Sequence, residues 1–80
     1  MNITRVEGTN DKALIVTKEG VDTLISYDTE VAEYNKNNGL LTVNGWYSNT
    51  TMKHLNKFFK MNGFPELTKK ELIEIYNLKQ

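Results

Sequence analysis

The sequence predicts an α+β fold, an antiparallel β-meander of four or five strands followed by two helices packed on one face of the sheet. Short β-branched or alternating apolar runs fill the first half, and only a few residues separate them, which favours antiparallel pairing of neighbours. Capping residues and apolar positions at helical spacing fill the second half. The 80 residues suffice for one domain, with a sheet part at 1–47 and a two-helix part at 48–80.

Five runs in the first half have strand character. The weakest stands at the start of the chain and is expected at a sheet edge. The dipeptide Asn38-Gly39 predicts a two-residue hairpin turn before the last run. Alternating residues should face opposite sides of the sheet. The runs are 2–6 (NITRV), 13–17 (ALIVT), 21–27 (VDTLISY), 29–35 (TEVAEYN) and 40–43 (LLTV).

The first helix is expected to begin after Ser48, whose hydroxyl can accept from a free amide of the first turn. Tyr47 and Met52 then occupy the two positions of a hydrophobic staple. The pair Asn62-Gly63 predicts the end of the helix, with the glycine left-handed and Phe64 packing back on Phe59 in the last turn. An apolar stripe at helical spacing runs along this segment, formed by Met52, Leu55, Phe58 and Phe59.

The second helix is predicted from a capping box, in which Thr68 and Glu71 satisfy each other's backbone amides. Leu67 and Leu72 stand at its staple positions. Trp46, before the first helix, is expected to cap the core where the sheet meets that helix. The second helix should present a broad apolar side, made of Leu72, Ile73, Ile75, Tyr76 and Leu78.

Composition excludes several function classes. The chain lacks Cys and has a single His, so neither a Cys-based zinc site nor another metal ligand set is expected. A Gly-x-Ser-x-Gly elbow and a glycine-rich phosphate loop are also missing. The prediction is a protein that is not an enzyme and carries no cofactor. The absence of a secretory signal, a membrane span and Cys predicts a cytoplasmic protein with no membrane partner.

The charge is unevenly distributed although the formal net charge is zero. Residues 1–47 have four basic and seven acidic side chains, a balance of −3, and residues 48–80 have six and three, a balance of +3. The zero total argues against strong general attraction to nucleic acid. The distribution predicts an acidic sheet half and a basic helical half.

A lysine strip is the leading candidate contact surface. Lys53, Lys57 and Lys60 stand at i, i+4 and i+7 and therefore share one side of the first helix, with Thr50 and His54 nearby. His54 is expected on this polar face, exposed to solvent or to a partner. The strip suits phosphates or an acidic protein surface. The competing interpretation is a solvated helix face, with Lys favoured near the C-terminus by the helix dipole.

A secondary acidic surface is the other candidate. Its carboxylates could mimic phosphate charge and occupy a basic groove on another protein, or they could simply be solvated. A helix-turn-helix is a weaker interpretation, since the connection 62–68 is longer than the turn of that motif. The acidic residues are Asp22, Asp28, Glu30 and Glu33.

Two segments carry a resemblance to a known group of proteins. "LISYDTEVAEY" and "WYSNTTMKHLNKFF" are similar to small uncharacterised proteins of phages and low-G+C Gram-positive bacteria, with a pattern SY-x-T-x-VA followed by YS-x-T-T-x-x-H-[IL]-x-x-F. The similarity covers about residues 24–64, and it implies a phage or prophage origin without implying an activity. The matching positions are Ser26, Tyr27, Thr29, Val31, Ala32, Tyr47, Ser48, Thr50, Thr51, His54, Leu55 and Phe58.

The first functional hypothesis is a small phage-encoded binding protein that inhibits or sequesters a host bacterial protein, as a counter-defence inhibitor of the anti-CRISPR type does. A phage origin favours this class, because small phage proteins without cofactors usually act by binding. The alternatives are a nucleic-acid-binding accessory protein that uses the lysine strip, and a structural or assembly module of a virion. A homo-oligomer is a further possibility, since it would add buried area to a small core.

Overall fold

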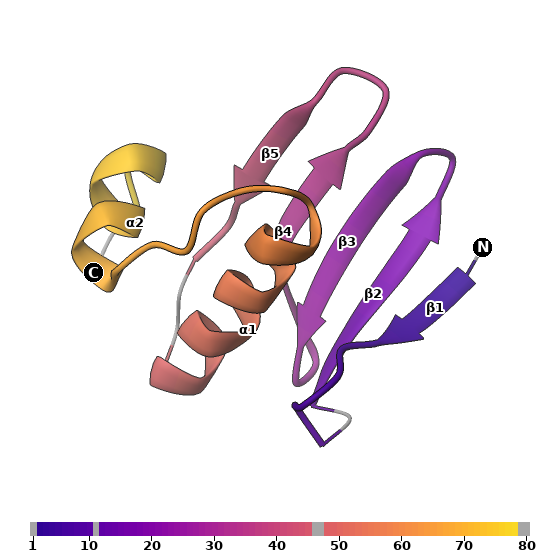
Figure 1. The fold of residues 1–80 in the computed structure, drawn as a ribbon, viewed down its shortest axis with the longest axis horizontal. Coiled ribbons are helices and arrows are strands. Elements are labelled where there is room, and N and C mark those ends of the chain that lie inside the picture. Colours follow the sequence, from indigo (N-terminus) through magenta and orange to yellow (C-terminus); the bar gives the residue numbers. More distant parts are fainter. Residues whose placement is uncertain (1, 11, 46–47, 79–80) are drawn as a thin grey trace.

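The computed structural model describes residues 2–10, 12–45 and 48–78. It confirms the α+β class, with five strands followed by two helices (Figure 1). Trp46 and Tyr47, for which a core cap and a hydrophobic staple were predicted, lie outside the described residues. The elements are β1 (Asn2–Arg5), β2 (Ala13–Lys18), β3 (Val21–Ser26), β4 (Thr29–Asn35), β5 (Leu40–Val43), α1 (Asn49–Met61) and α2 (Lys69–Tyr76).

The strands form one antiparallel sheet in the order β1-β2-β3-β4-β5, the predicted meander. The β4–β5 hairpin differs from its prediction. Asn35 pairs with Leu40, so the loop holds residues 36–39 and not two residues. Only Gly39 of the Asn38-Gly39 pair has a positive φ, at 73°, whereas the expected two-residue turn needs positive φ at both positions.

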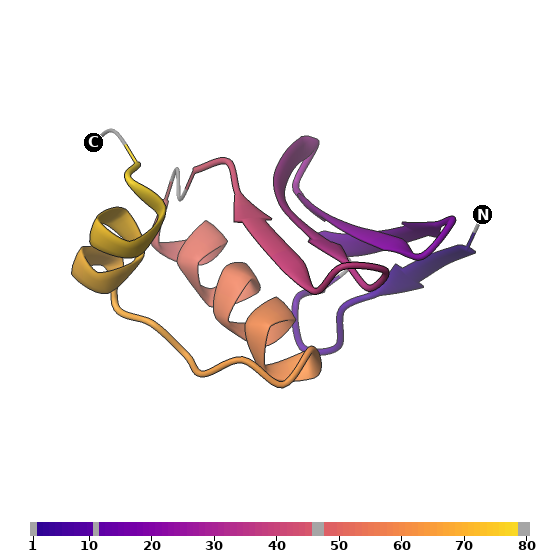
Figure 2. The same cartoon turned by 90° about the horizontal axis from the view of Figure 1, so that it is seen from above.

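The hydrophobic core lies between one face of the sheet and α1 (Figure 2). Leu24 on β3 and its cross-strand neighbour Ala32 on β4 are fully buried under the helix side, as are Leu55 and Phe58 of α1. A register shift at Leu24/Ile25 leaves an extra residue in β4, and two consecutive residues of that strand, at 31 and 32, are buried. Such a bulge bends the strand and increases its twist.

The helix ends follow the predicted capping chemistry. Ser48 Oγ accepts a hydrogen bond from the Thr51 amide at 3.1 Å. At the other end of α1, Gly63 has φ 81° and the Phe64 amide donates to the Phe59 carbonyl at 2.8 Å, which completes a Schellman motif. The Phe64 ring lies edge-on to Tyr34, 5.4 Å between centroids. The capping box of α2 also forms as predicted.

Helix α2 is anchored mainly by contacts with α1. The Asn56 side chain of α1 bonds both the amide (2.8 Å) and the carbonyl (2.9 Å) of Leu67 just before the helix. Tyr76 stacks on Phe59 at 6.4 Å between ring centroids. The expected broad apolar side is narrower than predicted. Leu72 is fully buried, but Ile75 remains 61% exposed, because α2 lies outside α1 with little of the sheet beneath it (Figure 1).

Candidate functional site

A polar pocket of about 250 Å³ lies where the N-terminal half of α1 meets two strand connections. The connection between β1 and β2 supplies residues 8–10 and Lys12, and the turn between β3 and β4 supplies Tyr27. Helix α1 supplies four of the predicted contact residues. We call this site the basic pocket and define it by Lys12, Tyr27, Thr50, Lys53, His54 and Lys57.

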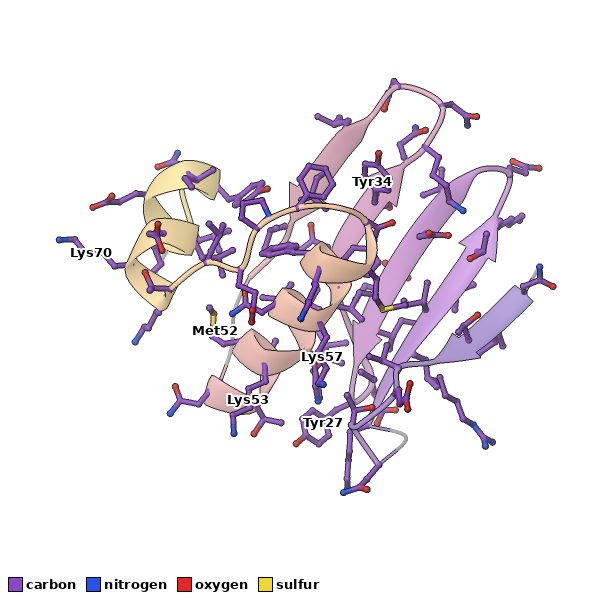
Figure 3. All side chains as sticks on the ribbon, in the orientation of Figure 1. Tyr27, Tyr34, Met52, Lys53, Lys57 and Lys70 are labelled. Carbon is purple, nitrogen blue, oxygen red and sulfur yellow. The ribbon has the colours of Figure 1, made fainter. Side chains whose placement is uncertain are left out.

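The lysines come from two parts of the fold. Lys53 and Lys57 extend from α1 on the side of Tyr27 (Figure 3), and Lys12 comes from the β1–β2 connection and lines the same pocket. Lys57 Nζ passes close to the backbone at Gly8, where a Cβ would stand 3.1 Å from it. All three lysines are exposed, and none is paired with a carboxylate in the described ranges. Their charges therefore add within one small volume.

Lys60, the third member of the predicted strip, lies in a neighbouring cavity. That cavity has a volume of about 440 Å³ and runs between the start of the chain and the C-terminal half of α1. Arg5, Glu7 and Met61 line it together with Lys60, and Lys57 stands on the border of both spaces. The predicted lysine strip therefore runs along one side of the helix, but its residues line two separate cavities of different composition.

His54 corrects the sequence prediction, because it is buried and not solvated. Only 3% of the side chain is exposed. Its Nδ1 lies 2.7 Å from Ser26 Oγ of β3, and its ring is 5.8 Å from the Tyr27 ring. The residue lines the basic pocket although it is almost completely buried, so we describe it as part of the pocket floor. It does not present itself as a free contact residue.

A chain of hydroxyl groups continues from His54 into the N-terminus of α1. Ser26 Oγ lies 3.3 Å from Thr51 Oγ1, which lies 3.1 Å from Ser48 Oγ, the helix cap. Ser26, Thr51 and His54 are all buried. The chain links the cap of α1 to the end of β3. It therefore anchors the helix on the sheet through buried polar groups that have few other hydrogen-bond partners. Loss of these bonds would leave buried polar groups unsatisfied and would lower the free energy of unfolding.

The protonation of His54 follows from this environment. Burial, and secondly the positive charge of Lys57, lower the pKa of His54 from its ordinary value. The ring is therefore neutral at pH 7, and the Ser26 hydroxyl can donate to Nδ1. The Ser26–His54 pair does not extend to a catalytic triad within the described residues, as no carboxylate bonds the ring there. Ser26 is itself only 2% exposed, so its hydroxyl is closed to a substrate.

Tyr27 is a pocket residue that sequence reasoning did not select. Its backbone is left-handed, with φ 58°, which is unusual for a bulky side chain. Its amide donates to the Lys12 carbonyl at 2.7 Å, and Lys12 Nζ lies 5.7 Å from the centre of its ring. The side chain is 49% exposed. The turn thus holds an aromatic ring in a pocket that three lysines also line. The sequence feature that could have identified Tyr27 is an aromatic residue in a connection of two residues between strands.

The predicted acidic surface is not one surface. Asp22 lies on the helix-facing side of β3, accepts a hydrogen bond from Thr17 at 2.6 Å and pairs with Lys36 at 3.5 Å. Glu30 and Glu33 lie opposite Ile25 and Thr23 and therefore point to the other side of the sheet. The fourth, Asp28, is exposed in the turn between β3 and β4. The four residues do not form one surface because strand alternation puts Asp22 on the opposite face from Glu30 and Glu33, where Thr17 donates to it and Lys36 pairs with its charge.

Two further features concern ligands and membranes. Among residues 2–10, 12–45 and 48–78, no cluster of three or more His, Cys, Asp or Glu side chains is arranged to hold a metal ion. Neither helix in the same ranges has the length and apolar composition needed to cross a bilayer.

Comparison with known proteins identifies a family and no characterised relative. Residues 1–74 match a family of unknown function, DUF8033. No curated protein and no solved structure matches the chain. The match covers the sheet part and the two-helix part as far as residue 74, and it includes the basic pocket and the buried hydroxyl chain. The chain therefore belongs to the DUF8033 family, a family of unknown function.

Proposed function

We propose that this is a non-enzymatic binding protein that docks an acidic surface of a partner protein on the basic pocket and the adjoining face of α1. One observation carries the proposal. Lys12, Lys53, Lys57 and Lys60 lie exposed on one side of the molecule, and no carboxylate in the described ranges is paired with them. Grouped, unneutralised lysines repel each other in the free protein, so a complementary acidic surface would relieve that repulsion and accelerate encounter.

The hydrogen-bonded residues beneath the basic pocket favour a binding function over catalysis. The His54 ring is held by Ser26 and is almost completely buried, and none of these Lys side chains is paired with an acid in the described ranges. The two strand connections and α1 are tied together through backbone and hydroxyl hydrogen bonds. A preorganised surface of this kind loses little conformational entropy on association.

The partner in this proposal is a host bacterial protein in the cytoplasm, and the consequence of docking is inhibition. The resemblance to phage proteins supports this part, since a phage protein without an active site acts on its host through contacts. The proposed contact lies at the N-terminal half of α1, beside Tyr27. The exposed Glu30 and Glu33 lie on the other side of the sheet and take no part in it.

The experiment is affinity purification from a lysate of a low-G+C Gram-positive host, with nuclease, using three forms of the tagged chain. The wild type is compared with the double charge reversal Lys53→Glu/Lys57→Glu. A matched control, Lys18→Glu/Lys70→Glu, changes the net charge equally on two exposed lysines that do not line the pocket, Lys18 at the end of β2 and Lys70 on α2 (Figure 3 labels Lys70). We expect one host protein in stoichiometric amount with wild type and control, and its loss with the pocket variant. Equal recovery with all three forms would reject this surface.

Nucleic acid is the second candidate, and Tyr27 is the observation that favours it. An exposed aromatic ring beside Lys12 and Lys53 resembles the combination that single-stranded nucleic acid uses, with bases stacking and phosphates paired to lysine. This function predicts capture that disappears after nuclease treatment. It also predicts affinity for a single-stranded oligonucleotide that falls steeply with added salt. Affinity that stays constant from low to moderate salt would exclude it.

A further inference from the structure

We propose that the basic pocket is a binding site for the phosphate group of a small phosphate monoester, with His54 Nε2 as a donor at its floor. This inference goes beyond docking of a partner protein, because it concerns what the pocket holds when the chain is alone. It rests on the composition of the pocket, its size, and the orientation that Ser26 imposes on the His54 ring.

The donors in the pocket suit a dianion. Three ammonium groups, from Lys12, Lys53 and Lys57, and the hydroxyl of Thr50 surround the same volume. Ammonium groups bind phosphate as point charges with rotatable donors. A single carboxylate would leave two of the three positive charges uncompensated, whereas a phosphate monoester carries up to two negative charges and three acceptor oxygens. The charge balance therefore favours phosphate.

The orientation of His54 adds a fixed donor to this set. Its Nδ1 is occupied by Ser26 Oγ at 2.7 Å. Among the described residues no buried side-chain nitrogen or oxygen lacks a partner, and no bond to Nε2 is found there. Nε2 is therefore the atom through which this otherwise buried ring reaches the pocket that it borders. In the tautomer that this proposal requires, Nδ1 accepts from Ser26, so the proton of the neutral ring lies on Nε2 and is available to the ligand.

Size and shape limit the ligand. A volume of about 250 Å³ is below the range of roughly 300–1,000 Å³ usual for sites that enclose drug-sized ligands. The pocket can therefore enclose a phosphate and the first atoms of its carrier, while the remainder stays outside. Tyr27, half exposed at the rim, offers a ring against which an organic carrier can pack. Its left-handed backbone holds the ring in this place at a local conformational cost.

The bound phosphate should also change the protonation of His54. The groups that face the ring from the surrounding elements are Lys12, Lys53, Lys57 and Tyr27. Lys57 contributes to the lowered pKa of His54 in the free protein. A dianion between these groups offsets the positive field, so it should raise that pKa. Phosphate bound only at lysines far from the pocket would not produce this shift.

The test is a titration of the purified, ¹⁵N-labelled full chain with inorganic phosphate at pH 7.5 and low salt, followed by two-dimensional NMR. We expect saturable shifts of amides in residues 8–10, 12 and 50–57. The His54 ring signals, followed from pH 5 to 8 with and without phosphate, should show a rise in the pKa of His54. The variant Lys53→Met/Lys57→Met should bind at least about tenfold more weakly, since a charge-assisted hydrogen bond contributes roughly 1.5–3 kcal/mol. The matched control Lys18→Met/Lys70→Met should bind within about twofold of wild type.

Several results would overturn the inference. Equal weakening in the two variants would mean that phosphate only screens surface charge. Shifts without saturation, or shifts centred elsewhere, would have the same meaning. Adenosine monophosphate should bind at least as tightly as phosphate, and weaker binding would contradict a monoester ligand. Lysine variants on an exposed face should keep the fold, which circular dichroism verifies. Saturable phosphate binding without a captured host protein would leave the pocket standing and would reject only the proposed function.

Discussion

Ser26→Ala should destabilise the protein more than its small change in volume suggests. The hydroxyl of Ser26 joins the end of β3 to α1 by contacts with His54 Nδ1 at 2.7 Å and Thr51 Oγ1 at 3.3 Å. Alanine removes both contacts and keeps the backbone, the strand register and nearly all of the packing. The substitution therefore isolates the polar connection between the sheet and the helix.

The expected cost follows from which partners are left without a bond. Thr51 Oγ1 keeps Ser48 Oγ at 3.1 Å, so the loss on that side is small. His54 Nδ1 loses the only partner it has among the described residues and is buried, which costs about 1–3 kcal/mol. We expect a decrease of about 2 kcal/mol in the free energy of unfolding. For an 80-residue domain this lowers Tm by roughly 8–16 °C.

Urea denaturation at pH 7.5, monitored by circular dichroism, measures the change directly. Thr42→Val is the control, because it removes a hydroxyl from an exposed position of β5 and should alter stability by less than about 0.5 kcal/mol. NMR of the His54 ring nitrogens provides a second readout, since loss of the Ser26 donor changes the balance between the two tautomers. If Ser26→Ala unfolds at the wild-type urea concentration, the hydroxyl chain does not stabilise the helix on the sheet.

Three other changes have defined outcomes. Because the pKa of His54 is lowered in the folded protein, the unfolded chain binds a proton at this histidine more readily. The contribution of His54 to the free energy of unfolding should therefore be fully present above about pH 6.5 and should decrease as the pH falls below it. Denaturation measured from pH 5 to 8 should show that His54→Gln removes this pH dependence. Asn56→Ala breaks both bonds to Leu67 and should cost about 1–2 kcal/mol, with faster hydrogen exchange in α2 before global unfolding. Gly63→Ala meets no atom within 4 Å but has φ 81°, so calorimetry should show a loss of about 1 kcal/mol from backbone strain alone.

The sequence predicted those parts of the fold that depend on neighbouring residues. Helix ends are decided within a few positions, and Ser48, Asn62-Gly63 and the Thr68–Glu71 box all function as expected. The meander followed from the short connections between strands. The length of the β4–β5 loop could not be obtained in the same way, because it depends on the register between β4 and β5, which side-chain packing under α1 helps to select.

The candidate site was predicted in part. Spacing along α1 correctly placed Lys53, Lys57 and Lys60 on one side. It also placed His54 among them, although Thr51, His54 and Leu55 are buried together at helical spacing. Whether a histidine at the border of the apolar stripe is buried depends on a partner elsewhere in the chain. Here that partner is Ser26, far away in sequence and at the end of a strand that α1 crosses.

The remaining differences between the predicted and the observed site depend on where the strands place individual side chains. Lys12 and Tyr27 belong to two strand connections that become neighbours only when Ala13 pairs with Ser26 in the folded sheet. This arrangement has no local pattern and follows from strand register, so an accurate pairing scheme would have been enough to predict it. Asp22 is different, because the alternation of β3 places it on the same face as the buried Leu24 and Ser26, where it contacts Thr17 and Lys36.

The most direct test of the binding surface is a hydrogen–deuterium exchange footprint of the complex formed with the captured host protein. The account predicts slower exchange in the β1–β2 connection and along residues 50–60 of α1, and unchanged exchange in β4 around Glu30 and Glu33. The footprint should disappear for Lys53→Glu/Lys57→Glu and persist for Lys18→Glu/Lys70→Glu. Protection confined to β4, or to the apolar surface of α2 around Ile75, would contradict the account and transfer the binding surface to that side of the molecule.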